Sequence, residues 1–218
     1  MGHTIAIDGP AGAGKSTIAR TLAKDLGFMY IDTGAMYRAM GLFMLENEVD
    51  LSHPDEIAKA SSGADINIDY EGNKPCIYLN GKNVTDSLRS EAVSDAASRV
   101  AAVHAVRERL VKRQRELAES RDVIMEGRDI GTKVLPMADV KFFLTASPEK
   151  RAERRYKELR DKGVECTLEE IRKDIEERDE RDTHRTASPL VQADDAVYVD
   201  TSDMTIDEAM EYMISYCF

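Results

Sequence analysis

One glycine-rich segment constrains this chain most: residues 9–16 are Gly-Pro-Ala-Gly-Ala-Gly-Lys-Ser. The segment follows an apolar run, Ile5–Ile7, and precedes a helical pattern over Lys15–Leu26 that ends at Gly27. Glycines in a strand-to-helix turn let backbone N–H groups converge on an anion, and the helix N-terminus adds free donors and a favourable dipole. The spacing and the flanking elements favour a phosphate-binding loop (P-loop) over a glycine-rich turn that is only structural.

Two side chains of this loop are expected to act on a nucleoside triphosphate. The Lys15 ammonium can bridge the β- and γ-phosphates, and the Ser16 hydroxyl can ligate Mg²⁺, so we expect ATP and Mg²⁺ as cofactors. The residues expected to contact ATP are Gly9, Pro10, Ala11, Gly12, Ala13, Gly14, Lys15, Ser16 and Thr17. A GTPase would also need Asn-Lys-x-Asp after a strand, and the nearest string, Asn80-Gly81-Lys82-Asn83, lacks the aspartate.

Short apolar runs alternate with helical patterns along most of the chain, which predicts an α/β fold with a five-stranded parallel sheet flanked by helices. The strands are expected at Thr4–Asp8, Phe28–Ile31, Val123–Glu126, Val140–Leu144 and Ala196–Val199. A helix is expected from near Ala35, and a long helix, straight or bent, is expected over Glu91–Glu119, where apolar residues recur at helical spacing. Thr205-x-x-Glu208 is a capping box that predicts the last helix.

Two segments interrupt this order. Over residues 64–85 apolar and polar residues alternate, and Asn80-Gly81 favours a tight hairpin turn, so we expect a small antiparallel insertion. Residues 148–186 are expected to form a helical lid, which begins at Ser147-Pro148-Glu149 and continues after a Thr167-x-x-Glu170 capping box. With no repeat or long linker, residues 1–218 are predicted to be a single domain with these two excursions.

The composition limits the partners. A formal net charge of −11 disfavours binding to nucleic acid, and no apolar run is long enough to cross a membrane. The three cysteines and four histidines are scattered, which indicates neither a disulfide framework nor a zinc site. We therefore expect a cytoplasmic protein that acts on small molecules.

Three groups of charged residues point to an anionic ligand. Arg151, Arg154 and Arg155 lie on one face of a predicted helix, where they can either form a solvated surface or close over a triphosphate. Residues 177–185 form a second group, in which Arg178 and Asp182 are i, i+4 partners. A salt-bridged surface helix is the alternative for this second group. Both groups belong to the expected lid.

The third group follows the strands of the sheet. Arg128 and Asp129 come directly after Val123–Glu126, and Asp32-Thr33-Gly34 follows the second strand. Because ligands of open α/β sheets bind beyond the carboxyl ends of the strands, these residues are expected at the same site as the P-loop.

Four strings together resemble bacterial cytidylate kinases, over nearly the whole chain and including the hairpin insertion. They are residues 7–16 (Ile-Asp-Gly-Pro-Ala-Gly-Ala-Gly-Lys-Ser), 32–38 (Asp-Thr-Gly-Ala-Met-Tyr-Arg), 126–132 (Glu-Gly-Arg-Asp-Ile-Gly-Thr) and 177–182 (Glu-Arg-Asp-Glu-Arg-Asp). The resemblance implies the P-loop kinase fold and transfer of the γ-phosphoryl of ATP to CMP or dCMP in pyrimidine nucleotide metabolism. It also implies a monomer. Glu126 stands where aspartate is often expected, so it is not assigned to the metal.

The resemblance also implies roles for individual residues. Arg38, Arg128 and Arg185 would bind the CMP phosphate, and Lys15 would bridge donor and acceptor phosphates. Ser98, Arg107 and Asp129 would recognise the cytosine edge, and Arg178 and Asp182 the sugar. The expected catalytic residues are Lys15, Arg128, Arg151, Arg154 and Arg155, and the expected substrate-binding residues are Thr33, Arg38, Ser98, Arg107, Arg128, Asp129, Arg178, Asp182 and Arg185.

Other functions remain open at this point. A UMP/CMP kinase or a shikimate kinase is the main alternative of the same class, although the hairpin insertion speaks against both. An ATPase that drives a conformational change in a partner or binds RNA is the alternative of another class, and the charge of −11 disfavours its RNA-binding form.

Overall fold

The structure is a computed structural model that describes residues 2–72, 74–161 and 163–217. Residues 73 and 162, inside the expected insertion and lid, lie outside the described residues. The chain divides into two compact units, of which the first comprises Met1–Tyr30 and Arg121–Phe218 and the second Ile31–Ser120.

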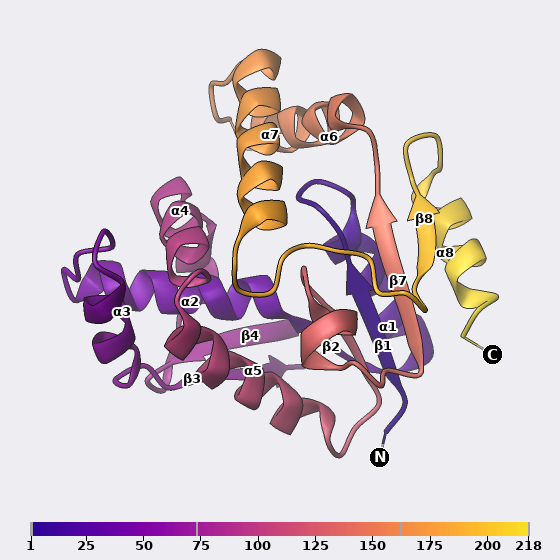
Figure 1. The fold of residues 1–218 in the computed structure, drawn as a ribbon. Coiled ribbons are helices and arrows are strands. Elements are labelled where there is room, and N and C mark those ends of the chain that lie inside the picture. Colours follow the sequence, from indigo (N-terminus) through magenta and orange to yellow (C-terminus); the bar gives the residue numbers. More distant parts are fainter. Residues whose placement is uncertain (1, 73, 162, 218) are drawn as a thin grey trace. The chain divides into compact units, whose positions relative to one another are not determined.

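The first unit is built on a five-stranded sheet with the order β2-β6-β1-β7-β8 (Figure 1). The strands are β1 (Thr4–Asp8), β2 (Met29–Asp32), β6 (Val123–Glu126), β7 (Val140–Thr145) and β8 (Val197–Asp200). β1 pairs in parallel with β6 and with β7, and β7 pairs in parallel with β8. Each predicted strand is confirmed to within one residue at either end, and so is the α/β class with a parallel sheet.

Helices α1 (Lys15–Leu26) and α8 (Ile206–Ile214) share an apolar core with this sheet. Ile18 and Leu22 of α1, Met213 of α8 and Phe142 of β7 are all at most 3 % exposed. Full burial of a side chain of this size stabilises the fold by about 1.5–3 kcal/mol, so this core fixes the strand-to-helix turn that joins β1 to α1. The predicted helix end at Gly27 and the predicted capping box of α8 are both present.

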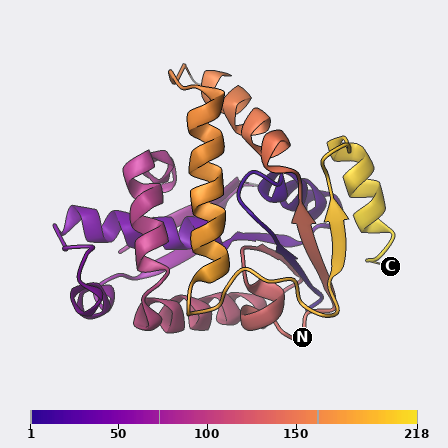
Figure 2. The same ribbon diagram turned by 45° about the horizontal axis from the view of Figure 1, so that its top comes forward.

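Helices α6 (Pro148–Asp161) and α7 (Leu168–His184) lie side by side in both ribbon views (Figures 1 and 2). They share a small apolar cluster of Ala152, Ile171 and Ile175, with Tyr156, Leu159 and Cys166 packed against it. The predicted capping box of Thr167 and Glu170 starts α7. A short π-helical turn, η2 (Ile130–Val134), connects β6 to β7.

The second unit contains the helices α2 (Thr33–Glu46), α3 (Pro54–Ser61), α4 (Glu91–Val100) and α5 (His104–Ala118) and the 3₁₀ helix η1 (Thr85–Arg89). Asp32 caps α2, because its side chain accepts a hydrogen bond from the Ala35 N–H. Gly41 lets α2 approach α4 closely, since a Cβ at this position would stand 2.8 Å from the backbone nitrogen of Ala97. The absence of a side chain on Gly41 therefore sets the distance between these two helices.

A three-stranded antiparallel sheet of β3 (Ile66–Glu71), β4 (Lys74–Leu79) and β5 (Lys82–Asn83) completes this unit. Ile68 pairs with Ile77, and Ile66 pairs with Leu79. Asn80 and Gly81 form the turn between β4 and β5 with φ of 48° and 78°, as the Asn-Gly dipeptide predicts.

The prediction of one long helix over 91–119, straight or bent, is wrong in that the helix is broken and not continuous. The structure has two helices, α4 and α5, and Val103 between them is extended with φ −85° and ψ 122°. Val100 and Val106 are fully buried, so each of the two helices has an apolar anchor of its own next to the break. The segment 101–103 is Ala-Ala-Val, which contains neither glycine nor proline, and helical periodicity continues across it. Tertiary packing therefore overrides the local preference here.

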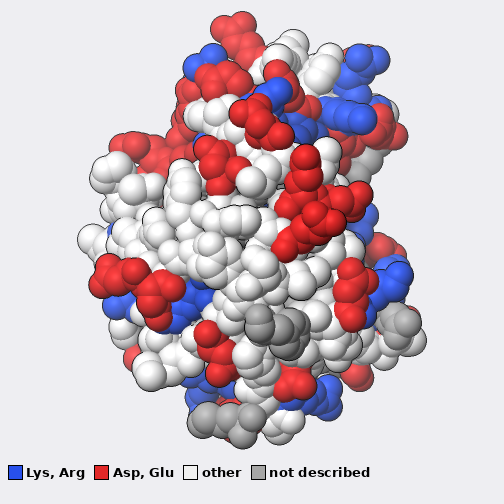
Figure 3. Space-filling view, turned by 90° about the vertical axis from the view of Figure 1, so that its right-hand side faces the viewer, with Lys and Arg blue, Asp and Glu red and all other residues white. Residues whose placement is uncertain are grey.

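Charge is unevenly distributed along the chain. Residues 186–218 contain seven Asp or Glu and no Lys or Arg. Figure 3 shows the side that carries β8 and α8, where uncharged surface in the centre is interspersed with acidic groups and basic groups lie mainly toward the edges of the view. Among the helices of the described residues, none has the length and apolar character needed to cross a bilayer.

Candidate functional site

The loop between β1 and α1 has the backbone conformation that its glycines predict. Gly12 and Gly14 have φ of 77° and 90°, in the left-handed region that other residues rarely adopt. A Cβ on Gly9 would stand 1.8 Å from the carbonyl oxygen of Leu144 on β7. Any side chain at this position would clash with β7, which explains why the first residue of the P-loop motif is glycine.

Lys15 is buried at the start of α1, with 6 % of its surface exposed. Its Nζ donates a hydrogen bond of 2.7 Å to the carbonyl oxygen of Pro10, in the same loop. Burial, and next the positive charge of Arg128, lower the pKa of Lys15 to about 7. Burial and the neighbouring cation both disfavour the charged ammonium of Lys15, so a bound anion would stabilise it strongly. Ser16 and Thr17, the next two residues of α1, are exposed.

Asp8, the last residue of β1, is buried with 4 % of its surface exposed, and the sequence motifs assign it no role. Its Oδ1 accepts a hydrogen bond of 2.8 Å from the Ile130 N–H, and its Oδ2 accepts one of 2.7 Å from the Gly131 N–H. Burial raises the pKa of Asp8 to about 6, although the two backbone N–H groups oppose this change. The available sequence signal was a carboxylate directly after the apolar run Ile5–Ile7, at the C-terminal end of a predicted buried strand.

The loop after β6 pairs its charges with the end of α7. Arg128 Nε lies 2.9 Å from Asp182 Oδ2, and Asp129 Oδ1 lies 3.5 Å from Arg185 Nη2. Thus the structure brings four of the predicted substrate-binding residues together, as two crossed acid–arginine pairs. Asp129 is 4 % exposed and Asp182 9 % exposed, so both carboxylates are removed from bulk water.

The electrostatics of Asp182 follow from this arrangement. Burial works to raise its pKa, but Arg128 and Arg178 outweigh the burial and hold the pKa of Asp182 below its usual value. Asp182 is therefore ionised at neutral pH, and Arg178 of α7 contributes to the same positive field that acts on Lys15.

The three arginines of α6 have different surroundings. Arg151 is buried, and its Nε and Nη1 donate to the carbonyl oxygens of Ala146 and of Ala11 in the P-loop at 2.9 and 3.1 Å. Arg154 donates to the hydroxyl and carbonyl oxygens of Thr201 at 3.0 and 2.6 Å. Arg155 is exposed and pairs with Glu158 at 2.8 Å.

Thr201 is a further residue at this site that no sequence motif predicts. It is 2 % exposed, follows β8 directly, and its hydroxyl contacts the carbonyl oxygens of Ala13 and Thr145 at 3.3 and 3.0 Å. Arg154 is thereby held beside the P-loop through Thr201. A lone threonine after a strand carries no distinctive pattern in the sequence, so nothing there marks this residue.

The other predicted substrate-binding residues belong to the second unit. Thr33 begins α2 and is buried, and Arg38, one turn later, pairs with Asp32 at 2.9 Å. Arg107 is 5 % exposed, its guanidinium carbon lies 5.7 Å from the centre of the Tyr37 ring, and its Nη1 donates to the Ala101 carbonyl at 3.4 Å. Ser98 lies on α4, whereas Arg107 lies on α5, so the break between these helices sets their separation.

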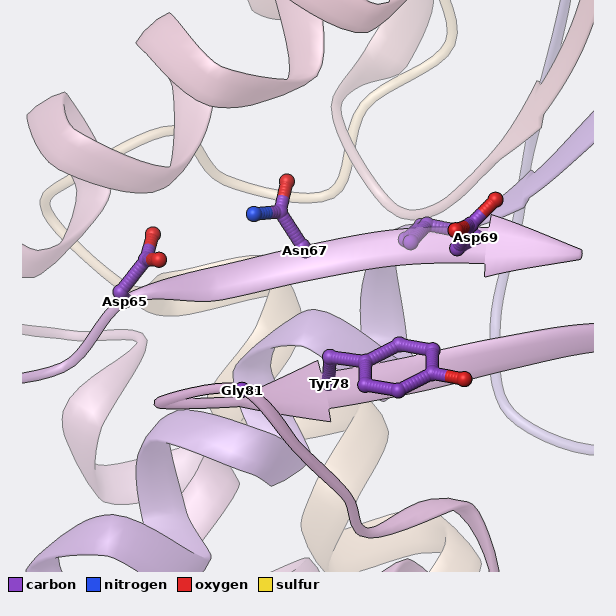
Figure 4. A pocket seen from close by; sticks show the side chains of 6 residues that line it. Asp65, Asn67, Asp69, Tyr78 and Gly81 are labelled. Carbon is purple, nitrogen blue, oxygen red and sulfur yellow. The ribbon is translucent and has the colours of Figure 1, made fainter.

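The second unit also has a hollow of about 380 Å³ on its antiparallel sheet, lined by Asp65, Asn67, Ile68, Asp69, Tyr78 and Gly81 (Figure 4). None of these lining residues belongs to the predicted site. Asp65 and Asp69 place two carboxylates in this hollow and none of its described lining residues is Lys or Arg, a lining that disfavours a phosphate group.

Glu126, at the end of β6, is 4 % exposed, and its Oε1 accepts a hydrogen bond from the hydroxyl of Tyr30 on β2. Tyr30 is itself 3 % exposed, so the longer side chain of glutamate has a buried partner. Within the described residues no group of three or more His, Cys, Asp or Glu side chains is arranged to hold a metal ion. Mg²⁺ usually keeps few protein ligands and binds substrate phosphates and water. The exposed hydroxyl of Ser16, at the predicted phosphate-binding loop, fits such a site.

Comparisons with known proteins identify the family of this chain. The cytidylate kinase family model matches residues 5–217. A cytidylate kinase of Pelotomaculum thermopropionicum is 51 % identical over 213 residues, which cover 97 % of this chain and 94 % of the relative. A cytidylate kinase of Caldanaerobacter subterraneus is 49 % identical over 207 residues, which cover 95 % and 91 % of the two chains.

Among solved structures, an uncharacterised protein of Eubacterium ventriosum aligns with a TM-score of 0.51 at 13 % identity, covering 99 % of this chain and 98 % of its own. This likeness concerns the fold alone. The sequence match, by contrast, spans the P-loop, both excursions and the loop after β6. The chain therefore belongs to the cytidylate kinase family and is a nucleoside monophosphate kinase.

Proposed function

We propose that this protein transfers the γ-phosphoryl group of ATP to CMP or dCMP and releases ADP with CDP or dCDP. The observation that carries the proposal is the family match over residues 5–217, at about half identity to curated cytidylate kinases. The buried Lys15 in a P-loop supports the donor half of the reaction, and the crossed pairs of Arg128 and Arg185 support the acceptor half.

On the donor side, the P-loop backbone and Lys15 would hold the β- and γ-phosphates, and Ser16 would be the protein ligand of Mg²⁺. The cation would neutralise charge on the phosphates when bound. Arg154 already lies at the P-loop through Thr201, and Arg155 is exposed and able to reorient. Positive charge from these two residues would stabilise the charge that develops on the transferred phosphoryl group.

On the acceptor side, Arg38, Arg128 and Arg185 would bind the phosphate of CMP. Each of them is paired with a carboxylate: Asp32, Asp182 and Asp129 respectively. A phosphate group offers the same charge-assisted hydrogen bonds as a carboxylate and a higher charge. Hence we infer that CMP takes over these guanidiniums and releases the carboxylates for other contacts.

The released carboxylates would recognise the nucleoside. Asp129 would accept a hydrogen bond from the N4 amino group of cytosine, while Arg107 or Ser98 would donate to N3 or O2. Uracil presents an oxygen where cytosine has the amino group, so a buried Asp129 would face another acceptor, which sites of this kind reject strongly. Arg178 and Asp182 would contact the sugar.

Helices α6 and α7 would act as the lid that excludes water, so that ATP is not hydrolysed. Transfer to a phosphate anion needs no strong base, because positioning and charge stabilisation supply most of the catalysis. Arg151 donates to the backbone carbonyls of Ala146 and Ala11 and forms an ion pair with Asp179 of α7. We propose that Arg151 also contacts ATP when ATP is bound. We also propose that the protein acts as a cytoplasmic monomer, as its family resemblance implies.

A coupled assay of ADP release tests the proposal, with CMP, dCMP, UMP, AMP and shikimate as acceptors. CMP and dCMP are expected to give the highest kcat/KM. A preference for UMP, AMP or shikimate would contradict the proposed specificity. ATP turnover that responds to RNA or to a protein, and not to CMP, would favour a P-loop ATPase instead.

A further inference from the structure

Asp8 lies between the two loops that the proposed reaction uses. It directly precedes Gly9, the first residue of the P-loop, and its carboxylate binds the backbone of Ile130 and Gly131, directly after Arg128 and Asp129. We propose that Asp8 is a positioning residue, which fixes the acceptor-binding loop 127–131 relative to the P-loop. This inference rests on the proposed function of Arg128 and Asp129.

The geometry distinguishes Asp8 from an ordinary buried carboxylate. Each of its two oxygens accepts one backbone N–H, at 2.8 and 2.7 Å, from consecutive residues of one loop. The strand pairing adds a third tie, because Gly127 N–H donates to the Ile7 carbonyl at 3.0 Å. Thus Arg128 and Asp129 lie between two points at which the loop is bound to β1, one at Gly127 and one at Ile130–Gly131.

The burial of Asp8 strengthens its hydrogen bonds to the Ile130 and Gly131 amides. Hydrogen bonds to a charged, buried acceptor are stronger than those between neutral groups, and loss of one partner leaves the other unsatisfied. At 4 % exposure, water cannot readily replace Asp8 at the two N–H groups. Without the carboxylate, the loop would lose one of its two anchors, and the directions of Arg128 and Asp129 would become less defined.

Asp8 does not point to a ligand in this arrangement, since both its oxygens are occupied by the protein backbone. Its effect on the reaction would therefore be indirect. Because the loop carries residues for CMP and none of the residues assigned to ATP, a change at Asp8 should weaken the use of CMP more than the binding of ATP.

The test compares Asp8→Asn with Asp139→Asn. Asp139 is a matched control near the opposite end of β1, where its Oδ2 accepts the Thr4 N–H and hydroxyl at 2.7 and 2.9 Å, away from the substrate loops. In Asp8→Asn the side-chain amide must turn its NH₂ group toward one of the two backbone N–H groups. We expect the KM for CMP to rise about tenfold or more, with a KM for ATP that changes less than threefold. The Asp139→Asn variant should keep both constants.

Amide hydrogen exchange in the ligand-free protein gives a second measurement that does not depend on the reaction. The Ile130 and Gly131 amides should exchange slowly in the unaltered protein and at least tenfold faster in Asp8→Asn and in Asp8→Ser, which keeps a single short acceptor. If these amides exchange as fast in the unaltered protein as in an unprotected chain, then the proposal is overturned, and no variant is needed to show it. Equal effects of Asp8→Asn and Asp139→Asn on the KM for CMP would also overturn it.

The two proposals fail in different ways. If the unaltered protein does not phosphorylate CMP, then the proposed function fails, while the exchange measurement still reports whether Asp8 holds the loop. If CMP is the substrate and the loop amides are unaffected by Asp8→Asn, then only the positioning role fails.

Discussion

Arg151 and Asp179 form an ion pair of 2.6 Å between α6 and α7, and the same guanidinium donates to the carbonyl oxygen of Ala11 in the P-loop. Arg151 therefore connects three segments of the first unit. The side chain of Arg151 is 5 % exposed and that of Asp179 is 23 % exposed, so water screens the pair only in part. A change of one partner leaves a buried charge without its counter-ion.

The first prediction concerns this pair. Asp179→Asn should lower the free energy of unfolding by about 2 kcal/mol, which is less than for a fully buried pair because Asp179 is partly exposed. Urea denaturation measures the change. Asp174→Asn, at an exposed position of the same helix, is the control and should shift the midpoint little. Equal midpoints for the two variants would show that the pair does not stabilise the fold.

The second prediction concerns Lys15. Lys15→Met should lower kcat for CMP phosphorylation at least about 100-fold, because the donor phosphates lose their buried cation. The ligand-free variant should remain as stable as the unaltered protein, since burial disfavours the ammonium that is removed. Steady-state kinetics and thermal unfolding measure the two effects. Lys24→Met, in the last turn of the same helix, should keep the activity.

The third prediction concerns base recognition by Asp129. Asp129→Ala should reduce the ratio of kcat/KM for CMP over UMP at least about tenfold, with a much smaller change in ATP binding. Asp129→Asn should move the ratio further toward UMP, because its amide can donate to O4 of uracil. Competition kinetics with both nucleotides would measure the ratio. An unchanged ratio in both variants would exclude Asp129 from base recognition, and Asp194→Asn serves as an exposed control.

The fourth prediction concerns pH. The pKa of Asp8 is raised from 3.8 to about 6 in the folded protein, so between these pH values the folded state holds a proton that the unfolded chain has released. The unaltered protein should therefore lose stability relative to Asp8→Asn as the pH rises from about 4 to about 6, by on the order of 3 kcal/mol. Carboxylates that titrate identically in both proteins cancel in this difference. Urea titrations at several pH values measure it, and a pH-independent difference would refute the raised pKa.

The sequence predicted those elements of the fold that depend on residues close to one another in the chain. The strand ends, the capping boxes at Thr167 and Thr205 and the turn at Asn80-Gly81 all follow from short-range chemistry, and all are present. The break at 101–103 was not predictable in this way, because it depends on the burial of Val100 and Val106 in separate helices.

The candidate site likewise contains residues that local sequence predicts and residues that only tertiary packing brings together. The P-loop and the loop after β6 were found because their residues are adjacent in sequence. Asp8 and Thr201 were missed because they act through partners that are distant in the sequence. The partners of Asp8 are 122 and 123 residues away, and those of Thr201 are 47 to 188 residues away. Likewise the contacts of Arg151 with Ala11 and Asp179 depend on tertiary packing.

Transfer of label from [γ-³²P]ATP in a single turnover tests the central claim most directly. With enzyme in excess over ATP and with CMP present, we predict that the label appears in CDP, and that Lys15→Met slows this transfer at least about 100-fold. Label that appears in inorganic phosphate at the same rate with and without CMP would contradict the account, because it would show an ATPase whose site does not use CMP as the acceptor.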